Sequence, residues 1–461
     1  MAVFEADQLA EWSSGSWGER SPERPISGFS HDSRKVEEGD LFIAIKTEER
    51  DGHDYLNHAN EKGAAGALVS EDRLDASLPQ LKVEDTLKAL RDCATAYRKT
   101  WDAEVIGITG SCGKTTAKDL LSVLLGDEPE VHSTEANLNN TIGVPLTLLR
   151  ADSRRCRFAV IEAGINQTGE MEQMADCIKP SLAVFTSIGP SHLEGLGDEE
   201  TIAVEKGQLA KTGSTRKAFL GDTCQPYRDS LFEGLGVSVN LSKDLKEEWD
   251  YQVQFDDGGS DLSVVMSDQV ENFRYHGQGS GLACNVTLAI AVACELGISN
   301  DLIRRRLLQW KPGNMRGEWV EIGPTRIFLD CYNANPLSMR DALESFIVMS
   351  VGDRPRLFIL GSMEELGGAA PLLHRRLGQE LPKRSQDSVL LVGEHGKSIY
   401  QGMKDSGNDL SDTILVDSIQ DFADSDFQFE GDIFVKGSRK YRLEKILQYV
   451  ESWSSAKEGK C

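Results

Sequence analysis

The segment Gly107-Ile-Thr-Gly-Ser-Cys-Gly-Lys-Thr-Thr116 is the most informative stretch of this chain. It continues an apolar run, Val105 to Thr109, that reads as a strand. After it, apolar residues at positions 117, 120, 121, 124 and 125 fall on one face of a helix. A strand, a glycine-rich turn and a helix in this order are typical of a parallel α/β sheet.

The turn carries the groups that a polyphosphate needs. Gly110 and Gly113 let the backbone curl so that its N–H groups and the helix N-terminus face an anion. Lys114 supplies a positive charge, and Thr115 supplies a hydroxyl for Mg²⁺. The strict GxxxxGK[ST] pattern would need glycine where Ile108 stands. We predict a nucleotide-binding loop; the alternative is a glycine-rich turn with an incidental lysine.

On either side of this loop the chain divides into three blocks, in agreement with a length of 461 residues. The first block reads as a small mixed unit, with a strand at Asp40 to Ile45 and helices at His58 to Lys62 and Leu87 to Arg98. In the second and third blocks, strands alternate with helices, which favours parallel sheets. The predicted strands of these two blocks are 105–109, 158–161, 182–188, 326–330, 356–360, 389–392, 414–416 and 433–435, and the predicted helices are 284–296 and 441–450.

We therefore predict an α/β protein of three domains. Residues 1–100 would form a small mixed α/β domain, and 101–312 a central P-loop-type parallel-sheet domain. Residues 313–461 would form a C-terminal Rossmann-like α/β domain. A charged stretch, Ser242 to Gly279, contains strand-like runs at 251–255 and 262–266 and predicts an antiparallel insertion. Lys311, Pro312 and Gly313 read as a hinge.

Composition excludes several classes of protein. Fifty Lys and Arg against 74 Asp and Glu give a net charge of −24, which would repel nucleic acid. No run approaches the ~20 apolar residues of a membrane span, and the acidic N-terminus lacks the pattern of a secretory signal. The nine cysteines show no CxxC or zinc-like spacing, as expected of reduced thiols. We expect a cytoplasmic protein without nucleic-acid partners or stable membrane insertion.

Polar residues follow two strands of the central block. Glu162 comes directly after the strand at 158–161, and His192 follows the strand at 182–188. Because ligands of open parallel sheets bind at the carboxyl ends of the strands, Thr115, Glu162 and His192 should share one rim. Oxygen ligands and a neutral histidine suit Mg²⁺ held beside a nucleotide. The alternatives are a helix-capping carboxylate and a loop histidine.

Two further motifs are ambiguous by themselves. Lys206 lies in Thr201-Ile-Ala-Val-Glu-Lys-Gly-Gln208, which reads as a helical surface segment with a solvent-exposed lysine. The segment Asp330-Cys-Tyr-Asn-Ala-Asn-Pro-Leu-Ser-Met339 follows a strand and places two amides and an aromatic ring in one loop. Such a loop can bind a base or ribose, or it can be a plain turn with Asx hydrogen bonds.

Taken together, these motifs resemble the Mur ligase family, the ATP-dependent amide-forming enzymes of peptidoglycan precursor synthesis, over nearly the whole chain. The N-terminal Asp32-Ser-Arg-Lys-Val, Gly39-Asp-Leu-Phe42 and Asp51-Gly-His53 are similar to the family's uridine-nucleotide-binding domain. The other matching segments are Thr134-Glu-Ala-Asn-Leu-Asn-Asn-Thr-Ile-Gly-Val-Pro-Leu-Thr-Leu-Leu149, Ser191-His-Leu-Glu-Gly-Leu-Gly197, Asp330-Cys-Tyr-Asn-Ala-Asn-Pro336, Leu360-Gly-Ser-Met-Glu-Glu-Leu-Gly367 and Val435-Lys-Gly-Ser-Arg439.

Within the family, the motifs are most similar to those of the member that joins D-alanyl-D-alanine to UDP-N-acetylmuramoyl-tripeptide. The resemblance implies that 1–100 bind the UDP precursor, that 101–312 bind ATP and that 313–461 form the ligase domain. It also implies ATP and Mg²⁺ as cofactors. It also implies a route in which the γ-phosphate of ATP passes to the tripeptide carboxylate, and the dipeptide amine attacks the resulting acyl phosphate. A monomer is the oligomeric state that the resemblance implies.

The same resemblance implies roles for single residues. The catalytic residues would be Lys114, His192 and Lys206. The cofactor-binding residues would be Gly110, Ser111, Gly113, Lys114, Thr115, Thr116, Asn285, Arg316 and Asp330. The substrate would contact Ser33 and Arg34 at its UDP end, Asn137 and Asn140 in the shared cleft, and Tyr332, Asn333 and Asn335 on the acceptor side. The metal ligands would be Thr115, Glu162, His192 and, if carbamylated, Lys206.

Alternatives to this function remain. Another Mur-type ligase or a folylpolyglutamate-synthase-like amide ligase would share the architecture. The enzyme that adds the third amino acid carries an Asp-Asn-Pro-Arg-type loop, which we do not find here. A non-catalytic nucleotide-binding homologue is a different class, and the intact Lys114, Glu162 and His192 speak against it.

Overall fold

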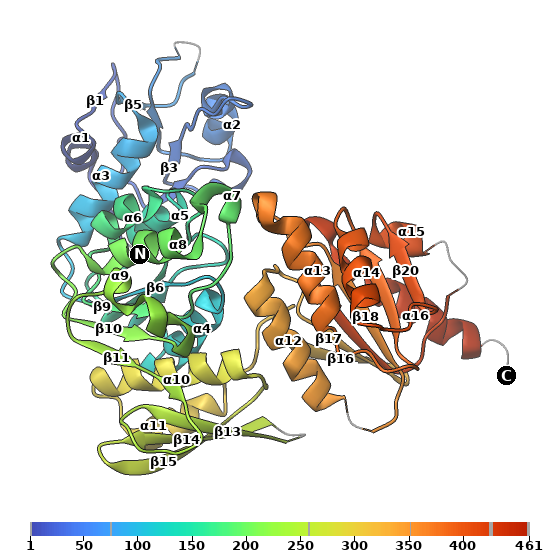
Figure 1. Ribbon diagram of the computed structural model, residues 1–461. Coiled ribbons are helices and arrows are strands. Elements are labelled where there is room, and N and C mark those ends of the chain that lie inside the picture. The colour runs from blue at the N-terminus through green and yellow to red at the C-terminus, as the bar shows by residue number, and fades with distance from the viewer. Residues whose placement is uncertain (1, 74–75, 257–258, 351, 424–426, 459–461) are drawn as a thin grey trace.

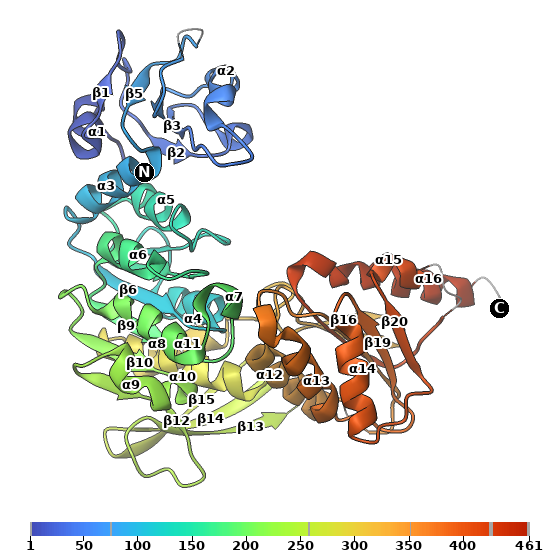
Figure 2. The same ribbon diagram turned by 45° about the horizontal axis from the view of Figure 1, so that its top comes forward.

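The computed structural model describes residues 2–73, 76–256, 259–350, 352–423 and 427–458. We call its described residues up to 100 the N-terminal lobe, those of 101–312 the central lobe and those of 313–458 the C-terminal lobe. The N-terminal lobe caps one end of the central lobe, and the C-terminal lobe lies against its side (Figures 1 and 2). The predicted α/β class is confirmed, whereas the domain boundaries at 100 and 312 stay a prediction.

The N-terminal lobe contains a five-stranded sheet in the order β1-β5-β4-β3-β2, in which only β1 runs antiparallel to its neighbour. The predicted strand at 40–45 ends two residues early, at Ile43. Asp85 begins α3, because its side chain accepts hydrogen bonds from the N–H groups of Leu87 and Lys88. The elements are α1 Ala6–Ser13, β1 Ser16–Trp17, β2 Gly28–Ser30, η1 Ser33–Lys35, β3 Asp40–Ile43, η2 Gly52–Tyr55, α2 Leu56–Glu61, β4 Gly66–Val69, β5 Gln80–Lys82 and α3 Thr86–Arg98.

The central lobe contains six parallel strands in the order β11-β10-β9-β6-β8-β7. β6 lies between β8 and β9. The predicted nucleotide-binding loop after β6, called the phosphate loop below, and the segments after β8 and β9 therefore leave the same edge of the sheet. The elements are β6 Glu104–Thr109, α4 Lys114–Leu125, β7 Val131–Ser133, α5 Gly143–Arg150, β8 Phe158–Glu162, α6 Glu170–Ile178, β9 Leu182–Phe185, α7 Leu193–Leu196, α8 Glu199–Gly207, η3 Gln208–Ala210, β10 Lys217–Leu220, η4 Asp222–Tyr227, α9 Arg228–Leu231, β11 Gly236–Ser238, α10 Ser280–Glu295 and α11 Asn300–Leu307.

Strand β9 is shorter than predicted and ends at Phe185 instead of residue 188. The chain leaves the sheet here because its next residues bind the phosphate loop. Thr186 Oγ1 donates to the carbonyl of Cys112 at 2.5 Å, and the carbonyl of Ser187 accepts from the N–H of Ser111 at 2.8 Å. These contacts tie the loop to the neighbouring strand.

The predicted antiparallel insertion is confirmed. β13, β14 and β15 form an antiparallel meander, and the short β12 pairs with β13 in parallel. The side chains of Tyr251, Leu262 and Phe273 bury one face of this sheet in the same core as α4 and α10. The strands are β12 Asn240–Leu241, β13 Asp250–Asp256, β14 Gly259–Met266 and β15 Gln269–Tyr275.

The C-terminal lobe contains a six-stranded sheet in the order β16-β17-β21-β18-β19-β20, with only β16 antiparallel. The elements are β16 Glu318–Ile322, β17 Thr325–Leu329, α12 Pro336–Met349, β18 Arg356–Gly361, η5 Gly367–Ala369, α13 Ala370–Glu380, β19 Ser388–Val392, α14 Gly396–Asp405, β20 Thr413–Val416, α15 Ile419–Ala423, β21 Asp432–Lys436, η6 Arg439–Tyr441, η7 Leu443–Lys445 and α16 Ile446–Glu458.

The closing helix predicted at 441–450 is wrong at its start. Two short 3₁₀ turns, η6 and η7, precede α16, which begins at Ile446. Arg442 between the turns has a left-handed backbone with φ 48°, which a continuous α-helix cannot include. No helix among the described residues has both the length and the apolar composition to cross a bilayer.

Candidate active site between the central and C-terminal lobes

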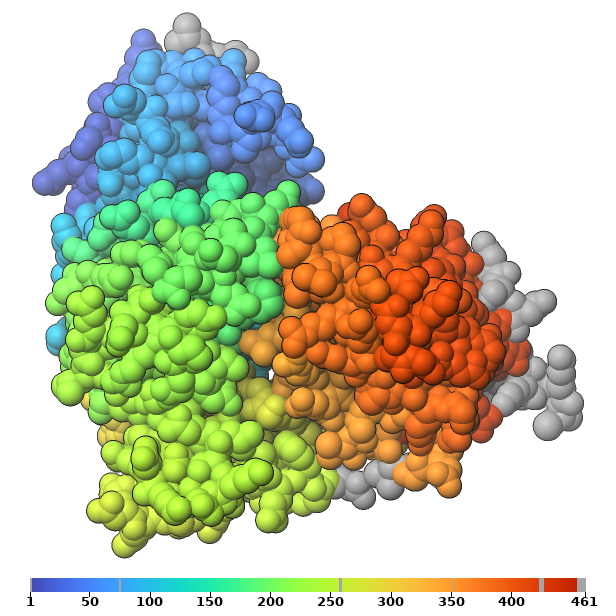
Figure 3. All heavy atoms as spheres, viewed as in Figure 1, coloured from blue at the N-terminus to red at the C-terminus, as the bar shows by residue number. Residues whose placement is uncertain are grey.

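One cavity of about 500 Å³ lies where the central and C-terminal lobes meet. Figure 3 shows the furrow between the two lobes. The walls of the cavity come from the phosphate loop, the segments after β8 and β9, the start of α10 and the loop after β17. Most predicted site residues line it: Ser111, Gly113, Lys114, Thr115, Thr116, Asn137, Asn140, Glu162, His192, Asn285, Arg316, Asp330, Tyr332, Asn333 and Asn335.

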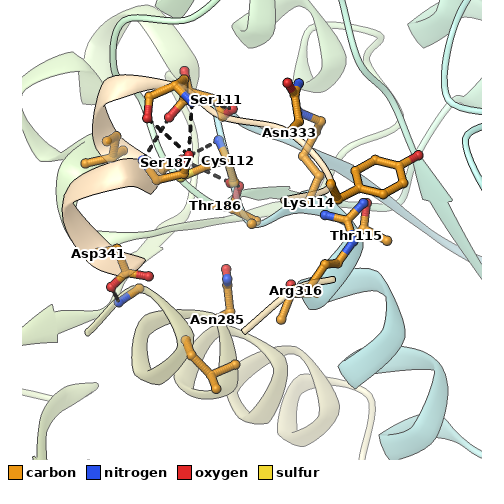
Figure 4. A pocket seen from close by; sticks show the side chains of 18 of the residues that line it. Ser111, Cys112, Lys114, Thr115, Thr186, Ser187, Asn285, Arg316, Asn333 and Asp341 are labelled. Carbon is orange, nitrogen blue, oxygen red and sulfur yellow. Dashed lines mark hydrogen bonds between the residues drawn. The ribbon is translucent and has the colours of Figure 1, made fainter. Parts of the chain in front are cut away.

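The phosphate loop depends on two glycines with positive φ. Gly110 has φ 154° and packs on Thr186, where a Cβ would lie 2.0 Å from Oγ1. Gly113 has φ 81°, and a Cβ there would lie 2.6 Å from Nδ2 of Asn285. Glycine at these positions therefore lets β9 and α10 approach the loop closely. Figure 4 shows Asn285 pointing from α10 toward the loop.

Lys114 is the first residue of α4 and points back over the loop. Its Nζ donates to the carbonyl of Gly110 at 2.8 Å. Burial lowers the pKa of the Lys114 ammonium, and the negative charge of Glu162 opposes that shift. The phosphate loop therefore holds a cation in a partly desolvated position, where an anionic ligand would stabilise its charge.

Glu162 has one oxygen in use and one free. Its Oε1 accepts from Nδ2 of Asn139 at 2.7 Å. Its Oε2 is buried and has no hydrogen-bond partner among the described residues. An unsatisfied buried carboxylate oxygen is costly, so this atom fits a bound cation.

Lys206 is fully buried, so the interpretation of its segment as solvent-exposed was wrong. The helix α8 turns this residue inward, and its Nζ has no hydrogen-bond partner among the described residues. Burial lowers the pKa of Lys206 well below its usual value, and the charge of Lys114 lowers it further. Lys206 does not line the cavity but lies near enough to Lys114 to feel its charge.

His192 lines the cavity and touches the C-terminal lobe. Its Nδ1 lies 2.5 Å from Oε2 of Glu365, in the loop after β18. The contact with His192 lowers the pKa of the Glu365 carboxyl. The edge of the sheet that carries His192 is therefore in direct contact with Glu365 of the C-terminal lobe.

The loop after β17 supplies the opposite wall. Asn335 begins α12 as its N-cap, and its Nδ2 donates to the carbonyl of Ser111 at 3.0 Å. The guanidinium of Arg316 lies 4.1 Å from the ring centroid of Tyr332. Figure 4 shows Arg316 and Asn333 beside Lys114 and Thr115. The loop therefore brings the predicted acceptor-side residues to the phosphate loop.

The remaining predicted residues lie elsewhere or are partly engaged. Asn140 faces the cavity, but its Oδ1 accepts from the N–H of Gly143, the first residue of α5, at 2.8 Å. Ser33 and Arg34 lie in the N-terminal lobe and do not line the cavity. Ser33 Oγ lies 3.0 Å from Nδ1 of His58, and the exposed guanidinium of Arg34 is paired with Asp32. Their predicted role at the UDP end stays a prediction.

Sequence reasoning missed four polar residues of the site. Asn139 donates to Glu162, and Ser187 accepts from the N–H of Cys112 in the phosphate loop. Asp341 of α12 accepts from the N–H of Gly281 at the start of α10. Lys436 is almost fully buried, and its Nζ lies 2.6 Å from Oδ2 of Asp330. Lys436 could have been found, because it lies in a matching segment at the end of a predicted strand.

Among residues 2–73, 76–256, 259–350, 352–423 and 427–458, no three His, Cys, Asp or Glu side chains gather as a ready-made metal site. This agrees with an ion that takes most of its ligands from a nucleotide and only one or two from protein.

Three family models match the chain. The Mur ligase middle domain matches residues 108–293, the "Mur ligase, glutamate ligase domain" matches 315–438, and the "Mur ligase family, catalytic domain" matches 25–98. Together they include both sides of the cavity.

Curated relatives match over nearly the full length. The chain is 31% identical to the UDP-N-acetylmuramoyl-tripeptide–D-alanyl-D-alanine ligase of Bacillus subtilis over 446 residues, which cover 92% of this chain and 93% of the relative. It is 29% identical to the Haemophilus influenzae ligase of the same name, with the same coverage.

Two solved structures have a fold similar to that of this chain. A crystal structure of MurF from Acinetobacter baumannii has a TM-score of 0.85 at 25% identity and covers 98% of this chain and 99% of its own. MurF from Thermotoga maritima, solved in complex with ADP, shares the fold with a TM-score of 0.79 at 24% identity, over 94% of this chain and 99% of its own. The prediction of an ATP-dependent peptide ligase is confirmed, and the chain belongs to the Mur ligase family.

Proposed function

We propose that this protein joins D-alanyl-D-alanine to UDP-N-acetylmuramoyl-tripeptide, with hydrolysis of ATP, in peptidoglycan precursor synthesis. One observation carries the proposal: a single cavity has Lys114, Glu162 and His192 on one wall and the loop 330–335 on the other. A cleft between two lobes suits a reaction that brings a nucleotide and two substrates together. The names of relatives that match over nine tenths of the chain support the same activity.

The chemistry requires an activated carboxylate. A carboxylate does not react usefully with an amine at neutral pH, so the γ-phosphate of ATP is transferred to the terminal carboxylate of the tripeptide. The amine of the dipeptide then attacks the acyl phosphate and releases phosphate. Both steps bring anions together, and Lys114 with the N-terminus of α4 supplies positive potential where charge develops.

Mg²⁺ fits the residues present. The free, buried Oε2 of Glu162 and the hydroxyl of Thr115 are hard oxygen ligands, and His192 would add a nitrogen ligand. When bound, the ion neutralises developing charge on the phosphates. The orientation of Glu162 comes from Asn139, which holds the other carboxylate oxygen.

Lys206 is suited to carbamylation. Because burial and the charge of Lys114 lower its pKa, the amine gives up its proton more readily than an exposed lysine, and the neutral amine can react with CO₂. The reaction releases a proton and gives an anion with two oxygens, which would place a negative charge near Lys114 and provide a ligand for a metal ion. The amine has no other partner among the described residues.

The long substrate would span two lobes. Ser33 and Arg34 would contact its UDP end in the N-terminal lobe, and Asn137 and Asn140 would line the path toward the phosphate loop. Asn285 and Arg316 would contact ATP, and Tyr332 and Asn333 would lie toward the acceptor. The boundaries of the three domains, the cytoplasmic location and the monomeric state belong to the same proposal.

The test is phosphate release from ATP and Mg²⁺ with UDP-N-acetylmuramoyl-tripeptide, in the presence and absence of D-alanyl-D-alanine. Release that depends on the dipeptide, with a product heavier by one D-alanyl-D-alanine minus water, is expected. Release with a different amine would indicate another ligase of this architecture. No release with any amine would indicate a non-catalytic homologue and overturn the proposal.

A further inference from the structure

Two residues with strained backbones meet across the interface of the central and C-terminal lobes. His192, just before α7, has φ 52°, and Glu365, in the loop after β18, has φ 63°. Residues other than glycine rarely adopt this left-handed conformation, which persists only where the surrounding structure imposes it. Both views place α7 beside the start of the η5–α13 segment (Figures 1 and 2).

The contact between them has two parts. Nδ1 of His192 lies 2.5 Å from Oε2 of Glu365. The N–H of Glu194 donates to the carbonyl of Glu365 at 3.2 Å. Side chain and backbone of Glu365 therefore both bind the segment that carries His192.

The loop that presents Glu365 is held firmly from its own lobe. Nε2 of His374 accepts from the N–H of Met363 at 2.8 Å, while Nδ1 of His374 faces the carbonyl of Ala370 at 2.6 Å. The carboxylate of Glu364 accepts from the hydroxyl of Tyr441 at 2.5 Å. The two residues before Glu365 are therefore anchored within the C-terminal lobe.

The chemistry of the contact assigns the imidazole proton. The contact is a close approach without hydrogen-bond geometry, because Nδ1 of His192 has no hydrogen-bond partner among the described residues. A carboxylate oxygen can only accept, so the ring nitrogen that lies 2.5 Å from it is the one that carries the proton. In the neutral ring, the lone pair is then on Nε2. Imidazole binds metals through such a lone pair, and a carboxylate on the other nitrogen orients the ring.

We propose that Glu365 is a positioning residue for His192: it reaches from the C-terminal lobe, lies against the Nδ1 side of the ring and leaves Nε2 available to a nucleotide-bound divalent cation. The inference rests on the proposed function, because it requires His192 to bind that cation. As a consequence, the cation site is complete only when the C-terminal lobe is docked on the central lobe. The same docking brings the loop 330–335 to the phosphate loop, so metal affinity depends on it.

The test measures Mn²⁺ binding to the full chain with a non-hydrolysable ATP analogue, by electron paramagnetic resonance. Glu365→Ala should weaken Mn²⁺ binding by about tenfold or more. Glu365→Gln, which keeps an oxygen acceptor, should lose less. Glu194→Ala is the matched control, because it removes an exposed carboxylate two residues from His192 but keeps the backbone N–H that binds Glu365. The Mn²⁺ affinity of this variant should stay within about twofold of the wild type.

A second readout is the ¹⁵N spectrum of the His192 ring. The proton should be on Nδ1 in the wild type and should distribute over both nitrogens in Glu365→Ala. Unchanged Mn²⁺ affinity or unchanged proton position in folded Glu365→Ala overturns the inference. His192→Ala shows where the failure lies: normal Mn²⁺ binding in that variant would disprove the metal role of His192, whereas weakened binding would confine the failure to Glu365.

Discussion

The side-chain amide of Asn335 donates a hydrogen bond of 3.0 Å from Nδ2 to the backbone carbonyl of Ser111. This bond joins the first turn of α12 in the C-terminal lobe to the phosphate loop of the central lobe. The Oδ1 of the same side chain accepts from the N–H of Ser338 at 2.8 Å and caps α12. One asparagine therefore serves both the helix and the contact between lobes.

Asn335→Asp should separate these two roles. Aspartate keeps the oxygen that caps α12 but lacks the donor to Ser111, so thermal stability should stay near that of the wild type. The lost hydrogen bond is worth about 1 kcal/mol, and the added negative charge near the phosphates acts in the same direction. We expect kcat/KM to fall about tenfold in steady-state kinetics.

The companion variant Asn335→Ala loses both hydrogen bonds. Its free energy of unfolding should fall by about 1 kcal/mol, because the helix cap is also removed. Wild-type kcat/KM in the aspartate variant would show that the contact with Ser111 contributes nothing to the reaction.

Lys114→Ala should lower turnover by on the order of 10² or more, because the variant removes the preorganised charge nearest the transferred phosphate. The measurement is kcat for phosphate release at saturating ATP. Lys211→Ala, which removes an exposed lysine of the same lobe, is the control and should leave kcat unchanged. A near-normal rate in Lys114→Ala would exclude the loop from the mechanism.

Lys206 should carry a carbamate that can be detected without an assay of activity. After incubation with ¹³C-bicarbonate, the wild type should show a carbamate carbon signal in its NMR spectrum. The signal should weaken as the pH is lowered, because the protonated amine cannot react with CO₂. Lys206→Arg should abolish the signal and lower turnover.

Lys118→Arg provides the matched control for this experiment. Lys118 is also buried, but its Nζ donates to the carbonyl of Thr134 at 3.0 Å and is paired with Asp119. Its Nζ is therefore already engaged by two partners, and replacing it should leave the carbamate signal in place. A signal that persists in Lys206→Arg would place the modification elsewhere.

Asp341 should make stability depend on pH. Its Oδ1 accepts from the N–H of Gly281 at 2.6 Å and from the hydroxyl of Ser280 at 3.2 Å, at the start of α10. Burial raises its pKa from 3.8 to about 6, and the nearby charges of Asp330 and Glu344 add to the shift. A carboxyl whose pKa is higher in the folded protein binds its proton more tightly when folded.

Protonation of Asp341 therefore favours the folded state, and this contribution is present below about pH 4 and lost as the pH rises through about 6. Asp341→Asn stays neutral and keeps an acceptor for Gly281. The free energy of unfolding of the wild type, relative to Asp341→Asn, should fall between about pH 4 and pH 6 and then level off. Chemical denaturation across this range measures it, and a constant difference would contradict the raised pKa.

The local parts of the fold could be read from the residues. The strand–glycine–helix order around Lys114 predicts the phosphate loop, and the strands before Glu162 and His192 predict a common edge. These predictions succeed because buried parallel strands leave short continuous apolar runs in the sequence, whereas amphipathic helices leave a period of 3.6. They fail where a tertiary contact ends an element, as at Phe185, where the chain leaves β9 to bind the phosphate loop.

Burial and pairing could not be read in the same way. The segment around Lys206 has the polarity of a surface helix, yet its lysine is fully buried beside Lys114. The partners of His192 and Ser111 are Glu365 and Asn335, which are more than 170 positions away in the chain and belong to another lobe. Such contacts depend on how two separately folded sheets dock, and no local pattern encodes that.

The order of residues alone therefore establishes the α/β architecture, the nucleotide loop and the family. Only the docking of the lobes decides which carboxylate orients His192, which amine is desolvated and where the cavity lies. The physical reason is that hydrophobic periodicity and glycine geometry act over a few residues, whereas desolvation and pairing depend on everything that surrounds a side chain in space.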